Sequence, residues 1–137
     1  MQVENTVGRL CVARFVPPFD VTEADQLARD IRGILGRLGR PAIFCNDTRR
    51  ARVFPPDVSD RITAMLRSDN PRVERSAVVI GSSSMFGLQI ERMFREAGNP
   101  GRRVFRSVAT IVAWLDEVLT PAEGARMRSF LAEDAGA

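Results

Sequence analysis

The sequence contains no lysine, no histidine and no tyrosine, and the first two absences each exclude a class of activity. Without histidine there is no general base for a Ser–His–Asp hydrolase. Without lysine the chain has no Gly-x-x-x-x-Gly-Lys-Ser/Thr loop for nucleotide phosphates. General acid and base chemistry would have to come from aspartate, glutamate or cysteine alone. The sequence therefore predicts a protein that is not an enzyme and that uses no cofactor.

Net positive charge is also low. Twenty arginines are set against 17 aspartates and glutamates, which gives a formal net charge of +3 at pH 7. Three charges spread over a whole domain fall well short of the clustered stripe that a phosphate-tracking surface needs. We therefore expect no nucleic-acid partner.

Long hydrophobic runs are missing as well. The longest, such as Ser76–Ile80 and Ile111–Leu115, are far below the roughly 18 residues needed to cross a bilayer. The first residues, Met1–Asn5, lack the basic and apolar regions of a signal peptide, so we expect a cytoplasmic protein with no membrane insertion. Cys11 and Cys45 fall in predicted strands without Cys-x-x-Cys spacing, which favours buried structural thiols over a redox pair.

A length of 137 residues suits one domain, and nothing repeats, so residues 1–137 are expected to form a single domain. Apolar runs that end in turn residues predict strands, and apolar residues at three- and four-residue steps predict helices. The expected strands are Val7–Val16, Ala42–Cys45, Ala77–Ile80 and Arg103–Arg106, with Met1–Glu4 pairing onto the first through a turn at Asn5-Thr6. The expected helices begin at Thr22, Pro55, the serines of Gly81–Ser84, Ser107 and Thr120.

Strands that alternate with helices after an initial hairpin predict an α/β fold, with a mainly parallel sheet of four to five strands and helices packed on it. In such sheets the loops that leave the carboxyl ends of the strands gather at one edge, where ligands and partners usually bind. We expect that edge to collect Asp47–Arg52, Gly81–Ser84 and Arg106–Ser107. Four arginines precede their strands and are expected at the opposite edge, namely Arg72, Arg75, Arg102 and Arg103.

This order of elements, with the tail Val104–Leu115 (Val-Phe-Arg-Ser-Val-Ala-Thr-Ile-Val-Ala-Trp-Leu), resembles bacterial STAS-like domains. These are relatives of the anti-sigma-factor antagonist SpoIIAA and share a superfold with lipid-carrying CRAL-TRIO domains. The resemblance implies a regulatory module that binds proteins and that, in some members, is switched by phosphorylation. The switch serine stands in an Asp-Ser-x-Gly motif that opens the second helix. This sequence has no such motif at that place: Asp47-Thr48 ends the strand, the helix opens with Pro55–Ser59, and Ser59 is the nearest serine.

Two loops at the expected edge carry the candidate binding residues. Arg49, Arg50 and Arg52 would receive a phosphate or an acidic partner surface, or else form a solvated loop in which Asp47 pairs with one arginine. The serines of Gly81–Ser84 would form an anion-binding nest or, at Ser83, a phosphorylation site. They would equally serve as a helix N-cap, and this interpretation is favoured because serine is a preferred cap.

Asp47 and Asp57 make a poor metal site, because no histidine and no acidic cluster accompanies them. Capping or turn formation is the favoured interpretation for both. We expect no bound metal.

Taken together, the patterns predict a non-catalytic regulatory module that binds a protein partner of a signalling pathway. The expected interface residues are Asp47, Thr48, Arg49, Arg50, Ser82, Ser83 and Ser84. On the third helix, the set Met85, Phe86, Met93 and Phe94 is broader than one buried stripe. Core packing explains most of it, and the remainder would form a homodimer face or line an apolar cavity. A carrier of a small apolar or lipid ligand is therefore the alternative function.

Overall fold

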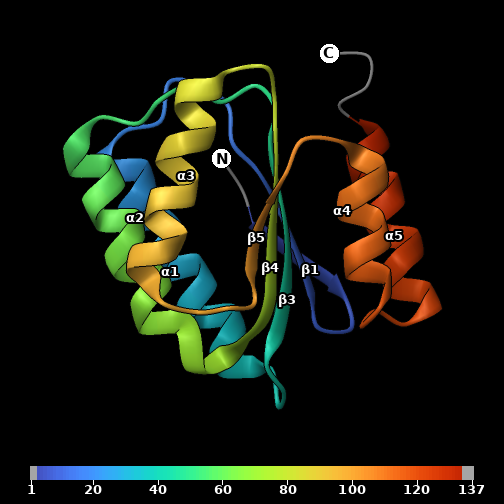
Figure 1. The fold of residues 1–137 in the computed structure, drawn as a ribbon. Helices are drawn as coiled ribbons and strands as arrows, with labels where there is room; N and C mark the ends of the chain where they lie inside the picture. Colours follow the sequence, from blue (N-terminus) through green and yellow to red (C-terminus); the bar gives the residue numbers. More distant parts are fainter. Residues whose placement is uncertain (1–2, 134–137) are drawn as a thin grey trace.

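Five strands form one sheet in the computed structural model, which describes residues 3–133 (Figure 1). The strands follow chain order across the sheet; β1 is antiparallel to β2, and β2 to β5 are parallel. The elements are β1 (Val3–Val7), β2 (Leu10–Arg14), α1 (Val21–Arg37), β3 (Ala42–Thr48), α2 (Pro56–Asp69), the 3₁₀ helix η1 (Asn70–Arg72), β4 (Val73–Ile80), α3 (Ser84–Ala97), β5 (Arg102–Phe105), α4 (Val108–Asp116) and α5 (Pro121–Glu133). The predicted α/β fold, with its mainly parallel sheet and N-terminal hairpin, is confirmed.

The helices form one layer on each face of the sheet. Crossovers between parallel neighbours are right-handed, so a sheet built in chain order places successive crossover helices on the same face. α1, α2 and α3 make these crossovers and lie together on one face, while α4 and α5 cover the other (Figure 1). Within residues 3–133, no helix is long and apolar enough to cross a membrane.

Side chains of the strands alternate between two apolar cores. On β3, Phe44 belongs to the core under α1–α3, whereas Ile43 and Cys45 belong to the core under α4 and α5. Because successive side chains of a strand point to opposite faces, the last two residues of β3 divide in the same way. Asp47 points toward α5, and Thr48 points toward the α1–α3 layer.

The turn of the N-terminal hairpin differs from the prediction. It lies at Gly8 and Arg9, whereas Asn5 and Thr6 belong to β1. Gly8 has φ +54°, a left-handed conformation that glycine adopts without steric cost. The Asn5 side-chain amide donates to the Gly8 carbonyl oxygen (3.0 Å), so Asn5 supports the turn from within the strand. Met1, where the predicted strand begins, lies outside the described residues.

Two parallel strands are longer than predicted because they include polar residues. β3 continues through Asn46–Thr48, and β4 begins at Val73 rather than at Ala77. The Asn46 side-chain amide donates to Ser76 Oγ (3.4 Å) and to the Ala77 carbonyl oxygen (3.1 Å), which satisfies polar groups within the sheet. A prediction from apolar runs stops at the first polar residue and therefore misses these extensions. β2 (Leu10–Arg14) is shorter than the predicted strand, and β5 (Arg102–Phe105) begins and ends one residue earlier than predicted.

Capping residues predicted most helix starts correctly. Ser83 and Ser107 are the N-caps of α3 and α4, and Thr120 begins α5 in the predicted capping box. The start of α1 differs, because its N-cap is Asp20 rather than Thr22. A carboxylate and a hydroxyl two residues apart are both suitable caps, and the sequence alone does not decide between them.

Candidate functional site

The carboxyl ends of β2 to β5 meet at one edge of the sheet, as parallel strands require (Figure 1). A Cβ on Gly81, at the end of β4, would lie against the carbonyl oxygen of Arg49, just after β3. Only glycine lets the two segments approach so closely. The two predicted binding loops, Asp47–Arg52 and Gly81–Ser84, therefore lie side by side.

Asp47 occupies the interior of this edge and is only 1% exposed. Its Oδ1 accepts hydrogen bonds from the backbone N and the Nε of Arg49, each at 3.0 Å. Its Oδ2 accepts from Arg49 Nη2 (3.0 Å) and Arg14 Nε (3.1 Å). Burial alone would raise the pKa of Asp47, but these hydrogen bonds lower it below its ordinary value. Asp47 is therefore an ionised carboxylate enclosed by arginine donors.

The same two arginines fasten α5 to the sheet. Arg14 Nη2 donates to the Phe130 carbonyl oxygen (2.6 Å), and Arg49 Nη2 donates to the Leu131 carbonyl oxygen (2.8 Å). Carbonyls in the last turn of a helix lack partners within the helix and carry the negative end of its dipole. The Arg14 guanidinium also lies over the Phe130 ring, 4.3 Å from its centroid. We call Arg14, Asp47 and Arg49 the arginine clamp.

The other predicted interface residues divide into a buried one and an exposed set. Thr48 is 2% exposed, and its Oγ1 donates to the Val79 carbonyl oxygen (2.9 Å). Arg50 and Ser82–Ser84 are exposed. The Ser83 hydroxyl accepts from the third backbone N–H of α3 (3.2 Å), which confirms the N-cap interpretation of this turn.

A groove of about 550 Å³ opens beside these serines, between α2 and α3. Three of its apolar side chains are exposed: Met85 (71%), Leu88 (65%) and Val53 (45%). Apolar side chains gathered on a surface in this way mark interaction sites. We call this surface the α2–α3 groove, lined by Val53, Phe54, Pro56, Ser59, Asp60, Met85, Leu88, Gln89, Arg92, Met93 and Glu96.

Gln89 holds the wall of the groove. Its Nε2 donates to the Phe54 carbonyl oxygen (2.8 Å), and its Oε1 accepts from the Phe54 backbone N (2.8 Å). The buried Phe54 ring meets Phe86 edge to face, with the ring centroids 5.3 Å apart. The loop before α2 is thus fixed to α3, and the groove is preformed.

The polar rim of the groove is mostly acidic. Asp60 and Glu96 contribute carboxylates, and Arg92 pairs with Glu96 through an Nε–Oε1 contact of 2.9 Å. Ser59 lies on the same surface, in the first turn of α2. Ser59 therefore lines the groove.

A smaller hollow of about 260 Å³ adjoins the groove, and Val53 and Phe54 line both. The rings of Phe15 and Phe19 pack against each other with centroids 5.2 Å apart, and Phe54 lies 5.5 Å from Phe19. The apolar surface of the carboxyl edge therefore extends from α3 to the segment that follows β2.

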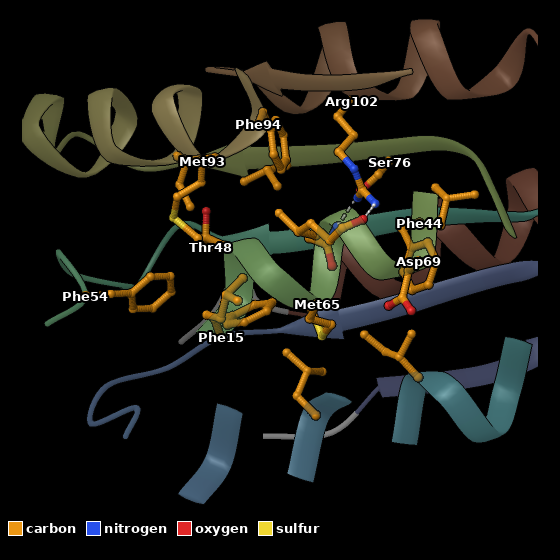
Figure 2. Close-up of a pocket in the computed structure, with 18 residues that line it drawn as sticks. Phe15, Phe44, Thr48, Phe54, Met65, Asp69, Ser76, Met93, Phe94 and Arg102 are labelled. Atoms are coloured by element: carbon orange, nitrogen blue, oxygen red, sulfur yellow. Dashed lines mark hydrogen bonds between the residues drawn. The ribbon is translucent and has the colours of Figure 1, made fainter. Parts of the chain in front are cut away.

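A cavity of about 60 Å³ lies inside the core, between the sheet and the α1–α3 layer (Figure 2). Its walls are mostly apolar and include Phe44, Met65 and Phe94, while Asp69 and Arg102 also line it. Ordinary ligand pockets measure roughly 300–1,000 Å³, so this cavity suits only a very small ligand.

The arginines predicted to precede β4 and β5 mostly lie within those strands. Arg75 and Arg103 extend over Trp114 of α4, with their guanidinium carbons 4.6 Å and 5.1 Å from the ring centroid. Arg102 is only 8% exposed and faces the core on the other side of β5. Because side chains alternate along a strand, adjacent arginines reach different faces of the sheet.

Cys11 and Cys45 are free, buried thiols that belong to the cores on opposite faces of the sheet. Burial raises the pKa of each to about 12, so both stay protonated at neutral pH. Among residues 3–133, no group of three or more histidine, cysteine, aspartate or glutamate side chains could hold a metal ion.

Two features of these sites were not predicted. Leu88 lies outside the buried stripe of α3, and an apolar residue off the stripe is a signal that would have pointed to the groove. Arg102 gave no such signal, because a charged residue in a short strand is ordinarily exposed. Its burial follows from tertiary packing alone.

Comparisons with known proteins found no matching family model, no matching curated protein and no matching solved structure.

Proposed function

We propose that the protein is a non-catalytic regulatory module of bacterial signalling that binds a protein partner through the carboxyl edge of its sheet and the α2–α3 groove. The exposure of Met85, Leu88 and Val53 in that groove carries the proposal. Removing apolar surface from water contributes about 25 cal/mol per Å², so a partner that covers these side chains gains binding energy from them.

The order of elements supports a STAS-like domain, as the resemblance implied. A hairpin leads into helices and strands that alternate in chain order, and α4 follows β5 over the tail segment Val104–Leu115. Within this proposal the partner is a signalling protein, in keeping with the regulatory role of that class.

The predicted interface residues take two roles in this proposal. Arg50 and Ser82–Ser84 are exposed at the carboxyl edge and contact the partner directly. Asp47, Thr48 and Arg49 are buried or half-buried and hold the edge in shape through the arginine clamp and the Thr48 hydrogen bond.

Ser59 is the better candidate of the two phosphorylation sites, because the Ser83 hydroxyl already caps α3. A phosphate on Ser59 would add about −1.5 to −2 charges to the rim that holds Asp60. Added charge beside an apolar groove raises the cost of covering it. Phosphorylation of Ser59 would therefore release the partner.

The test compares two charge insertions in the tagged full chain. One variant carries Met85→Glu and Leu88→Glu in the groove. The matched control carries Val108→Glu, an exposed apolar residue (38%) at the start of α4, on the other face of the sheet. Each tagged protein is purified at low salt from lysate of its native cells, and the bound proteins are compared by quantitative mass spectrometry.

The proposal expects a signalling protein that is retained by the wild type and by Val108→Glu and is lost from the groove variant. Circular dichroism and thermal melting check that each variant is folded. A partner set that is the same for all three proteins would contradict binding through the groove.

The alternative, a carrier of an apolar or lipid ligand, has weaker support. The cavity of about 60 Å³ would have to expand severalfold before it held a lipid chain. Native mass spectrometry of the purified protein separates the two functions, because a carrier would retain a lipid mass.

A further inference from the structure

The buried cavity has an unusual polar wall. Most of its lining is apolar, with side chains from the sheet and from all three helices of the α1–α3 layer. On one side, Arg102 reaches in from β5 next to Ser76, while Phe94 of α3 lies nearby (Figure 2). A guanidinium therefore borders a space that is otherwise suited to hydrocarbon.

Arg102 is held in place by neutral groups. Its Nε donates to Asn70 Oδ1 (3.1 Å), and its Nη2 donates to the Leu66 carbonyl oxygen (3.0 Å). Its Nη1 donates to no oxygen of residues 3–133, and none of the carboxylates in that range forms a salt bridge with Arg102. The guanidinium is thus positioned, while one donor and its charge remain available.

A buried charge that is only partly compensated is unfavourable. Burial lowers the pKa of Arg102 to about 10, although the nearby Asp69 raises it in part. Asp69 lines the same cavity without pairing to Arg102. Asp69 therefore offsets only part of the Arg102 charge, because no direct ion pair joins the two side chains. The site therefore has the chemistry to accept an anion.

The cavity has a short route to the surface. Arg102 and Phe94 line the cavity and also an open hollow of about 520 Å³ between α3 and β5. The charged side chains of that hollow are Glu91, Arg95, Arg102 and Arg103, so its balance is positive. A positive mouth raises the local concentration of anions. Phe94 is half-buried and separates the hollow from the cavity.

We propose that this cavity binds a short-chain monocarboxylate, with the carboxylate on Arg102 and the alkyl group among the apolar side chains of the core. The proposal goes beyond the protein-binding function and does not depend on it, because none of its anchoring residues lines the carboxyl edge. A ligand in this position would bridge β5, α2 and α3, and would thereby act as a small-molecule effector of the α1–α3 layer.

The cavity also sets the class of acid. Its volume is about 60 Å³, far below the roughly 300–1,000 Å³ of ordinary ligand pockets, which limits the ligand to the smallest acids and excludes long chains. A dicarboxylate would bring a second negative charge toward Asp69 and be repelled. Affinity should therefore rise from acetate to butyrate and then fall for hexanoate and octanoate.

The chain provides its own reporters for a test by NMR. Met65 and Met93 line the cavity, and Met93 also borders the groove, whereas Met85 is exposed in the groove and Met127 is buried on the opposite face of the sheet. The full chain is labelled with ¹³C at the methionine methyl groups. It is titrated with sodium acetate, propionate, butyrate, hexanoate and octanoate, against sodium chloride at equal ionic strength.

We expect propionate and butyrate to shift the Met65 and Met93 signals saturably, while Met85 and Met127 stay in place. Arg102→Gln should weaken butyrate binding at least roughly tenfold, since a charge-assisted hydrogen bond is lost. Its matched control is Arg75→Gln, because Arg75 faces Trp114 on the other side of the sheet and lines neither the cavity nor the hollow, so this variant should bind as the wild type does.

A second variant keeps the test independent of any loss of stability in Arg102→Gln. Val78→Leu adds a methylene that fills part of the cavity, so it should abolish butyrate binding without lowering the melting temperature. Three outcomes would each overturn the proposal. Sodium chloride could reproduce the shifts, all four methionines could shift equally, or Val78→Leu could bind butyrate as the wild type does. Tighter binding of octanoate than of butyrate would overturn the size limit and favour a lipid carrier.

Discussion

The two faces of the sheet are covered in different ways. On one face, charged side chains bind the helix backbones or their ends: Arg14 and Arg49 hold the last turn of α5, Arg75 holds α4, and Glu123 of α5 accepts from the Arg9 backbone N (2.8 Å). On the other face, α1, α2 and α3 pack mainly through apolar side chains, although Arg102 binds the Leu66 carbonyl of α2. A cavity lies beneath these helices and a groove lies between two of them.

The two faces therefore differ in what they contribute to stability and to binding. Directional hydrogen bonds to a helix backbone fix its position, whereas apolar contacts still permit small shifts. Exposed apolar side chains and an internal cavity both reduce stability or solubility, and proteins retain such features where they function. We infer that the α4–α5 face chiefly stabilises the fold and that the α1–α3 face carries the interactions with other molecules.

The arginine clamp should give the largest effect on stability. Asp47→Asn keeps the shape of the side chain but leaves two guanidinium groups around a neutral amide. We expect a loss of about 3 kcal/mol in the free energy of unfolding, because removing one partner of a buried ion pair leaves the other charge uncompensated. Urea denaturation followed by circular dichroism measures it.

The matched control is Asp116→Asn, which makes the same replacement in an exposed pair with Arg128. Exposed pairs contribute about 0–1 kcal/mol, so the control should remain near the wild type. Equal losses for the two variants would mean that burial of Asp47 adds nothing, and the proposed contrast between the faces would fail.

The hairpin turn should give the next largest effect. Gly8 has a positive φ, and a Cβ at this position would lie against the Glu123 carboxylate. Gly8→Ala should therefore strain the turn and displace the group that caps α5, at a cost of about 2 kcal/mol. Chemical denaturation measures the loss, and Gly36→Ala serves as control, since nothing lies within 4 Å of its Cβ position.

For the control, alanine in place of an exposed helix glycine should stabilise the chain slightly. A Gly8→Ala variant that is as stable as the wild type would show that α5 does not depend on this turn.

The helix caps and the hairpin turn show what the sequence could and could not predict. The helix caps at Ser83, Ser107 and Thr120 were predicted because a cap depends on residues within one turn of each other. The contact of Gly8 with Glu123 joins residues far apart in the chain, and no local pattern reports it. The turn was therefore placed at Asn5-Thr6, which has the ordinary composition of a turn.

The candidate site divides in the same way. That the loops after β3 and β4 would meet followed from the topology of a parallel sheet, and the structure confirms it. Which of their residues face solvent could not be predicted, because burial of Asp47 depends on two arginines and on a helix almost at the end of the chain. The cavity and Arg102 depend on how three helices pack, which periodicity does not report.

The two faces should also respond to acid in opposite ways. On the α4–α5 face, burial alone would raise the pKa values of Asp47 and Glu123, but hydrogen bonds from arginine and backbone N–H groups lower both. Stability from these groups is present above the ordinary carboxyl pKa of about 4 and is lost as pH falls through the lower folded-state values. On the α1–α3 face, burial raises the pKa of Asp69, so its protonation favours the folded state.

Urea unfolding at several pH values between about 3 and 7 tests this contrast. Glu123→Gln should reduce the loss of stability at acid pH, and Asp69→Asn should raise stability near neutral pH, where Asp69 is otherwise ionised. If both variants changed the free energy of unfolding in the same direction near neutral pH, the prediction that the two faces respond oppositely to acid would be wrong.

The smallest effect on stability should come from the groove, and this is what distinguishes a binding surface from a core. Leu88→Ser should change the free energy of unfolding by less than about 0.5 kcal/mol, because Leu88 is mostly exposed. Ile90→Ser, two residues along the same helix, should cost about 3 kcal/mol because that side chain is buried. If Leu88→Ser destabilised the chain as much as Ile90→Ser, Leu88 would belong to the packing of α3. The proposal that the groove binds a partner would then be contradicted.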